Sequence, residues 1–166
     1  FCFYYYSFKG RKLLDLPLRQ FMENERINFP FCIMWVNENW TRRWDGLQHE
    51  ILIAQDDSEE EISHLIKDIL PIIKHKNYIK IDGRPVILIY NPRKIPNPQK
   101  VLNEWREVCI TNKLKPPYII AAQTFGYQSD LFEEVYDGLV EFPPHLFSNE
   151  VYPVSKTSVD ILCDQF

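Results

Sequence analysis

Glycine is scarce in this chain, with five residues among 166, and no G-x-G-x-x-G pattern is present. An open nucleotide-binding sheet usually carries such a glycine-rich turn after its first strand. The chain also lacks G-x-S-x-G, the turn that presents a nucleophilic serine in α/β-type hydrolases. These absences weigh against a dinucleotide-binding domain and against serine catalysis.

An excess of basic residues is also missing, because 19 lysines and arginines face 23 acidic residues and the net charge is −4. Nucleic-acid binding requires a basic surface that neutralises phosphates, so we predict no nucleic-acid partner. No apolar run approaches the roughly 20 residues of a membrane span, and no signal peptide is visible. We therefore expect a cytoplasmic protein without a membrane span.

Metal-binding patterns are absent too. The four cysteines form no C-x-x-C pair and lie far apart: Cys2, Cys32, Cys109 and Cys163. Buried, reduced thiols are the expectation for such cysteines. The histidines are scattered without ligand spacing, and Asp56 and Asp57 are interpreted as capping or solvent-exposed acids. We predict no metal and no cofactor.

What the chain does have is a regular alternation of apolar segments. Five of them have the length and composition of buried strands: 1–8, 29–36, 85–90, 117–122 and 138–142. Helical spacing of apolar residues follows in 16–22, 58–73 and 98–109, and weaker helical segments in 130–136 and 159–163. Ser58 and Glu61 form a capping box at the start of the second helix, and Pro71 is expected to kink its last turns. This alternation predicts a parallel sheet covered by helices.

Polar and aromatic side chains gather where these strands end. They are Tyr5, Tyr6, Asn37, Glu38, Tyr90, Asn91, Gln123 and Glu141. Convergence of such groups from several strand ends is how barrel active sites are built, but five strands are too few to close a barrel of about 250 residues. We therefore predict a partial (β/α)8 barrel over residues 1–150 and leave 151–166 unassigned. An open doubly wound sheet is the competing architecture.

The densest group of such side chains lies in residues 35–46, W-V-N-E-N-W-T-R-R-W-D-G. Flat indole faces beside amides and guanidinium groups suit a polyhydroxylated ligand such as a sugar. We predict that Trp40 and Trp44 stack on sugar rings and that Asn37 binds a hydroxyl group; the alternative is that the indoles only anchor the loop. The predicted substrate contacts are Tyr6, Trp35, Asn37, Asn39, Trp40, Arg43, Trp44, Tyr90, Gln123 and His145.

Glu38 and Glu141 are the two glutamates at strand ends. Glycoside chemistry commonly uses two carboxyl groups that flank the scissile bond, so these two are the candidate catalytic residues. The alternatives are that Glu38 pairs with Arg42 or Arg43, and that Glu141 is a salt-bridged residue at the rim.

Four segments together resemble the WbsX-type glycosyltransferase family, whose members are also described as glycoside hydrolase family 99-like. The segments are F-C-F-Y-Y-Y at 1–6, P-F-C-I-M-W-V-N-E-N-W-T-R-R-W-D-G at 30–46, D-G-R-P-V-I-L-I-Y at 82–90 and E-F-P-P-H at 141–145. The resemblance implies a (β/α)8 barrel related to endo-α-mannosidases, with a carbohydrate substrate in bacterial surface polysaccharide of the O-antigen type. It leaves transfer and hydrolysis open.

The hydrolase relatives carry their catalytic acids in a later Asn-Glu-Trp-x-Glu-Gly-like stretch, which this sequence lacks. The resemblance therefore implies that the main acid pair lies downstream and that this chain alone is inactive. The positions it carries over are Trp35, Asn37, Glu38, Asn39, Trp40 and Tyr90. A non-catalytic carbohydrate-binding module is the main alternative, and a nucleotide-dependent transferase with an open sheet is a third.

Overall fold

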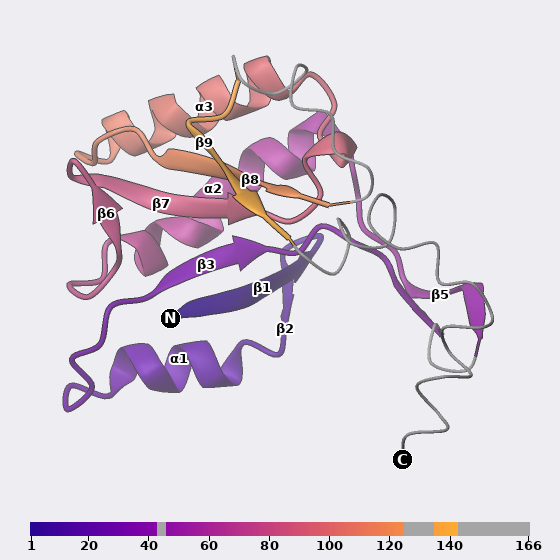
Figure 1. Cartoon of the computed structure of the whole chain (residues 1–166), viewed down its shortest axis with the longest axis horizontal. Helices are drawn as coiled ribbons and strands as arrows, with labels where there is room; N and C mark the ends of the chain where they lie inside the picture. The colour runs from indigo at the N-terminus through magenta and orange to yellow at the C-terminus, as the bar shows by residue number, and fades with distance from the viewer. Residues whose placement is uncertain (43–45, 125–134, 143–166) are drawn as a thin grey trace, which may run out of the picture.

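The structure, a computed structural model, describes residues 1–42, 46–124 and 135–142. The elements, in chain order, are β1 (Cys2–Phe8), β2 (Arg11–Leu13), α1 (Leu16–Glu23), β3 (Cys32–Trp35), β4 (Trp40–Arg42), β5 (Leu47–Ile53), α2 (Glu59–Ile73), β6 (Lys80–Ile81), β7 (Arg84–Ile89), the 3-10 turn η2 (Pro92–Lys94), α3 (Pro98–Thr111), β8 (Tyr118–Gln123) and β9 (Gly138–Glu141). Within these residues the fold is mixed α/β, with three α-helices and a mostly parallel sheet (Figure 1).

The five long strands of the sheet are parallel neighbours that stand in chain order, β1, β3, β7, β8 and β9. Two short strands pair antiparallel with them, β2 with β1 and β6 with β7. The predicted parallel sheet is confirmed. Across the described strands the sheet stays open, and it does not close into a barrel. A separate hairpin of β4 and β5 extends from the carboxyl edge of the sheet (Figure 1).

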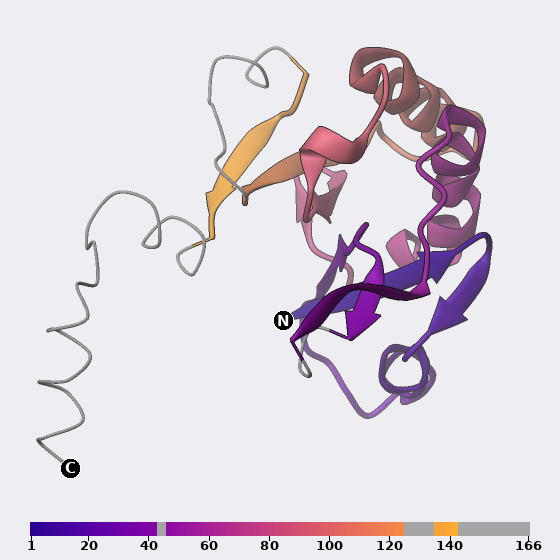
Figure 2. The same cartoon turned by 90° about the vertical axis from the view of Figure 1, so that its right-hand side faces the viewer.

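All three helices cover the same face of the sheet (Figure 2). On that face Ile33, Ile87 and Ile119 are register partners across β3, β7 and β8, and all are fully buried. Helix α1 joins this layer through Phe21, whose ring centroid lies 5.2 Å from that of Phe3. The apolar face predicted for the second helix is also buried here: Ile62, Leu65, Ile66, Ile69 and Ile73.

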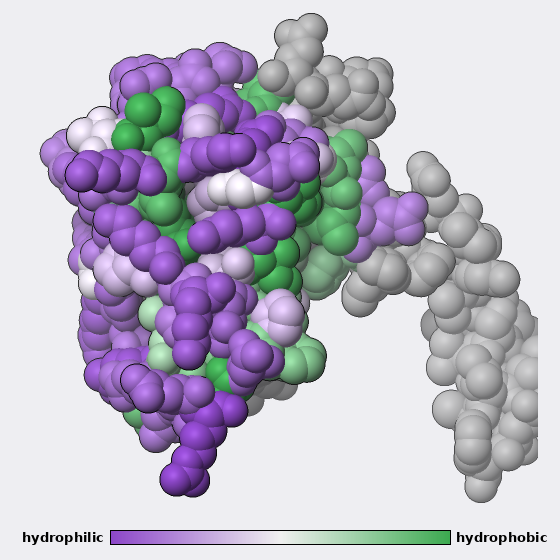
Figure 3. Space-filling view, turned by 90° about the vertical axis from the view of Figure 1, so that its left-hand side faces the viewer, coloured by the Kyte–Doolittle hydropathy of each residue, from purple (hydrophilic) through white to green (hydrophobic). Residues whose placement is uncertain are grey.

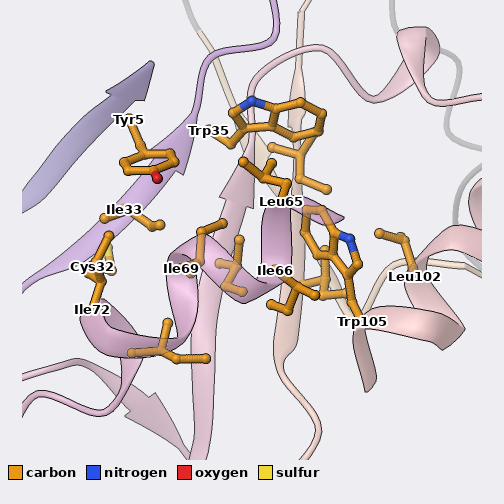
Figure 4. Close-up of a cluster of buried hydrophobic side chains, with 14 of the residues drawn as sticks. Tyr5, Cys32, Ile33, Trp35, Leu65, Ile66, Ile69, Ile72, Leu102 and Trp105 are labelled. Carbon is orange, nitrogen blue, oxygen red and sulfur yellow. The ribbon is translucent and has the colours of Figure 1, made fainter. Parts of the chain in front are cut away.

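The indole of Trp105 is the largest fully buried side chain and joins α3 to α2. Its Nε1–H donates a hydrogen bond to the carbonyl of Ile62 at 2.8 Å. Its ring centroid lies 6.0 Å from that of Trp35, which comes from the sheet (Figure 4). A single side chain thus connects both helices with the strand that leads into residues 35–46.

The predicted start of α2 is confirmed, because the Ser58 hydroxyl accepts a hydrogen bond from the N–H of Glu61 at 3.4 Å. The Ser58 N–H donates to Asp56 instead of Glu61, so only this half of the predicted capping box forms. The helix continues through Pro71 to Ile73. The helix predicted at 159–163 lies outside the described residues, and so do residues 130–134 of the helix predicted at 130–136.

The face at the amino ends of the strands is mostly hydrophilic, with apolar groups confined to small areas between polar ones (Figure 3). In the part of the chain that the structure describes, no helix is long and apolar enough to traverse a bilayer. The cytoplasmic location stays a prediction.

Candidate functional site

The carboxyl ends of β3 and β7 are joined by the side chain of Asn37, which is 0% exposed. Its Nδ2–H donates to the carbonyl of Asn91 at 2.7 Å, and its Oδ1 accepts from the N–H of Asn91 at 2.8 Å. This reciprocal pair continues the strand pairing past the last residues of the two strands. The sequence predicted that Asn37 binds a sugar hydroxyl. Because its side chain is buried and bonded to Asn91, it holds the ends of the two strands in place instead.

Glu38 follows directly and is the group that this pair holds in place. One oxygen of its carboxylate accepts a hydrogen bond from the Asn91 Nδ2–H at 2.5 Å, and the other lies 3.4 Å from the Lys94 ammonium. The Glu38 side chain remains 29% exposed. Lys94 is thus a cationic partner of Glu38 that the sequence did not predict. Arg42 pairs with Glu50 at 3.0 Å, and Arg43 lies outside the described residues.

Asp57, in the loop before α2, is a further carboxyl group that feels the charges of Glu38 and Lys94. Gln55 ties this loop to the end of β3, because its N–H donates to the Asn39 Oδ1 at 2.8 Å. Burial raises the pKa of Asp57; the positive charge of Lys94 opposes the rise, and the negative charge of Glu38 adds to it. Asp57 is exposed, as the sequence predicted, but its pKa also responds to the charges of Lys94 and Glu38.

Asp56, in contrast, is the capping acid that the sequence predicted. Its carboxylate accepts a hydrogen bond from the N–H of Ser58 at 3.0 Å and lies 3.1 Å from the Lys9 ammonium. These contacts lower the pKa of Asp56, with the hydrogen bonds from Ser58 as the largest cause. The pKa values of these two adjacent aspartates are thus shifted in opposite directions.

Asp57→Asn is expected to raise the free energy of unfolding at pH 7, by about 0.5 kcal/mol or less because the group is largely exposed. A raised folded-state pKa means that ionised Asp57 costs stability above that pKa, and the cost disappears as the pH falls toward the ordinary value of 3.8. Urea denaturation across pH 4–8 measures this. Asp56→Asn is the control with the opposite sign at pH 7, and equal signs for the two variants would contradict the assignment.

Aromatic rings line the inner face of the sheet, the face away from the helices, near the same edge. The indole of Trp40 meets the ring of Tyr6 edge-on at 5.4 Å and that of Phe8 at 5.7 Å. Tyr90, at the end of β7, meets Phe142 at 5.4 Å. Trp40, Tyr6 and Tyr90 are only partly buried, so parts of their rings remain open to a ligand.

Trp35 lies on the other face. It is 3% exposed and belongs to the core between the sheet and the helices (Figure 4). The prediction of a substrate contact is therefore wrong for Trp35, because no ligand reaches it without opening the core. The Asn39 side chain accepts from the Gln55 N–H and so orders the loop that carries Asp57.

Gln123 and Glu141 are register partners at the ends of β8 and β9. The register places them on the face of Ala121 and Leu139, the helix-covered face, rather than on that of Tyr90. Two strands separate Glu141 from Glu38, a spacing of roughly 14 Å along the sheet. Glycosidase carboxyl pairs lie about 5 to 9.5 Å apart. The predicted pairing of Glu38 with Glu141 as the two catalytic acids is not supported.

The family model described as Glycosyltransferase WbsX matches residues 1–163. The chain belongs to the WbsX family. It is similar to two proteins, both named Uncharacterized protein WxcX, from Xanthomonas campestris pv. campestris strains B100 and ATCC 33913. Each is 35% identical over 146 residues, which cover 88% of this chain and 21% of the relative. The chain thus spans about a fifth of the length of these curated relatives. No solved structure matches it.

The range matched by the WbsX model contains the whole group around Glu38, which we call the Glu38 cluster: Asn37, Glu38, Asp57, Asn91 and Lys94. Among the described residues, no group of three or more histidine, cysteine, aspartate or glutamate side chains is arranged to hold a metal ion. Arg43, Trp44 and His145 lie outside the described residues, so their substrate contacts stay predictions.

Sequence reasoning on this WbsX-family chain missed Asp57 and Lys94, and did not foresee the bonding of Asn91. Lys94 follows a strand end within the turn η2, where Asn91 caps the turn by accepting from the N–H of Arg93 at 3.2 Å. A lysine shortly after a strand end was a usable signal. The sequence carries no such signal for Asp57, because only the folding of the loop brings this residue near Glu38.

Proposed function

We propose that this chain forms the substrate-gripping wall of a carbohydrate-active enzyme that acts on glycosidic bonds in bacterial surface polysaccharide, of the O-antigen type. The observation that carries the proposal is Glu38, a partly exposed carboxylate held by Asn91 and Lys94 at the carboxyl edge of a parallel sheet. A carboxylate held in this way accepts hydrogen bonds from sugar hydroxyls without first losing conformational freedom. Membership of the WbsX family supports the carbohydrate substrate.

The aromatic rings beside the Glu38 cluster supply the apolar part of such a site. Trp40 and Tyr6 lie together where β4 leaves the sheet edge, and Tyr90 follows β7. Ligand sites combine apolar and aromatic walls with a few polar groups that fix orientation. In our proposal the rings pack against the carbon face of a sugar while Glu38 and Lys94 bind its hydroxyl groups.

The sheet supports a partial (β/α)8 barrel as the framework. Its parallel strands follow one another without the reversal of order that a doubly wound sheet shows. The inner face carries Met34, Leu88, Ile120 and Val140, and no described helix covers it. An apolar sheet face requires a second layer. We propose that further strands of the longer protein close the barrel over this face and bring the main acid pair to Glu38.

The proposal is tested on the longer protein with a glycan array that carries bacterial O-antigen polysaccharides. Bound glycans are then assayed for cleavage, and as acceptors with sugar nucleotides as donors. Turnover in either assay supports an enzyme, whereas binding without turnover favours the alternative of a non-catalytic binding module. An array without a bound glycan, together with the absence of turnover, would overturn both.

Trp40→Ala is expected to weaken the affinity for a bound glycan about 3- to 10-fold, because one aromatic face is worth about 0.5–1.5 kcal/mol beyond its buried area. Isothermal titration calorimetry with the array hit measures the change. Leu52→Ala is the matched control: it lies in β5 of the same hairpin, is 58% exposed and does not belong to the aromatic group. Equal losses in both variants would remove Trp40 from the site.

A further inference from the structure

Two thiols that are distant in the sequence meet at the amino end of the sheet. Cys2 of β1 and Cys32 of β3 are register partners in neighbouring parallel strands. Register partners point to the same face of a sheet, so the two side chains lie beside each other. Both cysteines are free, and each thiol shifts the pKa of the other.

The pair has no part in the function proposed above. The Glu38 cluster and its aromatic rings gather at the carboxyl edge of the sheet, whereas Cys2 and Cys32 are the first residues of their strands. The third described cysteine, Cys109, is fully buried in α3 and lies apart from them. The expectation of buried, reduced thiols is confirmed for Cys32 and Cys109 and is wrong for Cys2, which is exposed.

The backbone spacing permits a bond between the two sulfur atoms. Neighbouring strands lie about 4.8 Å apart, inside the range of about 4.4–6.8 Å found between the Cα atoms of disulfides. The Cβ atoms of register partners stand at a similar separation, slightly beyond the usual disulfide range of about 3.5–4.5 Å. A disulfide here is thus accessible but under mild strain, and strained disulfides are the readily reduced ones.

The exposure of Cys2 and the lowered pKa of Cys32 also favour reaction of the pair with a disulfide reagent. Cys2 is exposed, so a small reagent reaches it, while Cys32 is 8% exposed and is shielded behind it. The interaction between the two thiols lowers the pKa of Cys32 and raises the pKa of Cys2, so the pair ionises first at Cys32. A reactive thiol with a resolving partner is the arrangement of redox-sensitive cysteines.

We propose that Cys2 and Cys32 form a redox-modification site at which a low-molecular-weight disulfide of the glutathione type reversibly cross-links β1 to β3. The Cys32 thiolate takes up the proton of the Cys2 thiol while the Cys2 sulfur attacks the reagent, forms a mixed disulfide and releases one thiolate. Cys32 then attacks the Cys2 sulfur and releases the second. The two protein thiols lose two electrons and two protons, and one reagent disulfide becomes two thiols.

The test is incubation of this chain with glutathione disulfide, followed by trypsin digestion and mass spectrometry without reductant. We expect the peptide that ends at Lys9 to be linked to residues 27–42, and both to separate after dithiothreitol. Alkylation of Cys2 by iodoacetamide should slow at least about tenfold after oxidation and recover on reduction. A glutathione adduct on Cys2 without cross-linked peptides, or no modification, would overturn the proposal.

Cys32→Ser provides the matched control, because it leaves Cys2 exposed without a resolving thiol. Cys2 should then keep its glutathione adduct, and no cross-link should form. Cys109 serves as the internal control and should stay unmodified in the folded protein, with circular dichroism to confirm folding. The wild-type peptide map decides the outcome even if the variant fails to fold, and it is independent of glycan binding or turnover.

Discussion

Glu38→Gln in the longer protein is expected to lower turnover by about 100-fold or more if Glu38 takes part in proton transfer. Gln keeps the size of the side chain and still accepts the hydrogen bond that Asn91 donates at 2.5 Å. It loses the charge that faces Lys94 at 3.4 Å, and it no longer accepts a proton at its working atom. The measurement is kcat and KM, determined separately on the glycan that the array identifies.

Lys94→Gln is the control that separates the carboxylate from its ion pair. It removes the ammonium group and leaves the Asn91 contact to Glu38 in place, so its effect on kcat should be the smaller one. A loss confined to KM in Glu38→Gln would make Glu38 a binding residue. Unchanged kcat and KM, with a lower free energy of unfolding, would make it structural.

Trp105→Ala is expected to lower the free energy of unfolding by about 3–5 kcal/mol. The indole is fully buried, its Nε1–H bonds the carbonyl of Ile62, and its ring packs against Trp35. Removing it leaves a cavity at the point where α3, α2 and the sheet meet. Urea denaturation of the chain, followed by far-UV circular dichroism, measures the loss without relying on the fluorescence of the deleted residue.

Trp105→Phe is the matched variant, since it keeps an aromatic ring and gives up the hydrogen bond. We expect it to cost about 1–2 kcal/mol, well below the alanine variant. If the two variants destabilised equally, the hydrogen bond rather than the packing would dominate at this position. A loss below about 1 kcal/mol in both would mean that Trp105 does not join the helices to the sheet.

The sequence by itself determined the elements and the family of this protein. The isoleucine spacing of α2, its capping Ser58 and the apolar strand segments predicted the parallel sheet and its helices, because local periodicity and capping act within a few residues. The N-E-N-W-T-R-R-W-D-G block indicated the WbsX family, which the family model confirms. The strand ends also brought Asn37, Glu38 and Asn91 together, as the sequence predicted, but not Asp57 and Lys94.

Only the tertiary structure decided which face each side chain takes. A strand that is apolar on both faces does not reveal which one the helices cover, so Trp35 was assigned to the ligand and lies in the core. Asn37 was expected to bind a sugar hydroxyl, yet it is buried and its side chain bonds the backbone of Asn91. Loop packing brought Asp57 to Glu38, and strand register joined Cys2 to Cys32. These partners are set by contacts between segments distant in the chain, which local patterns do not encode.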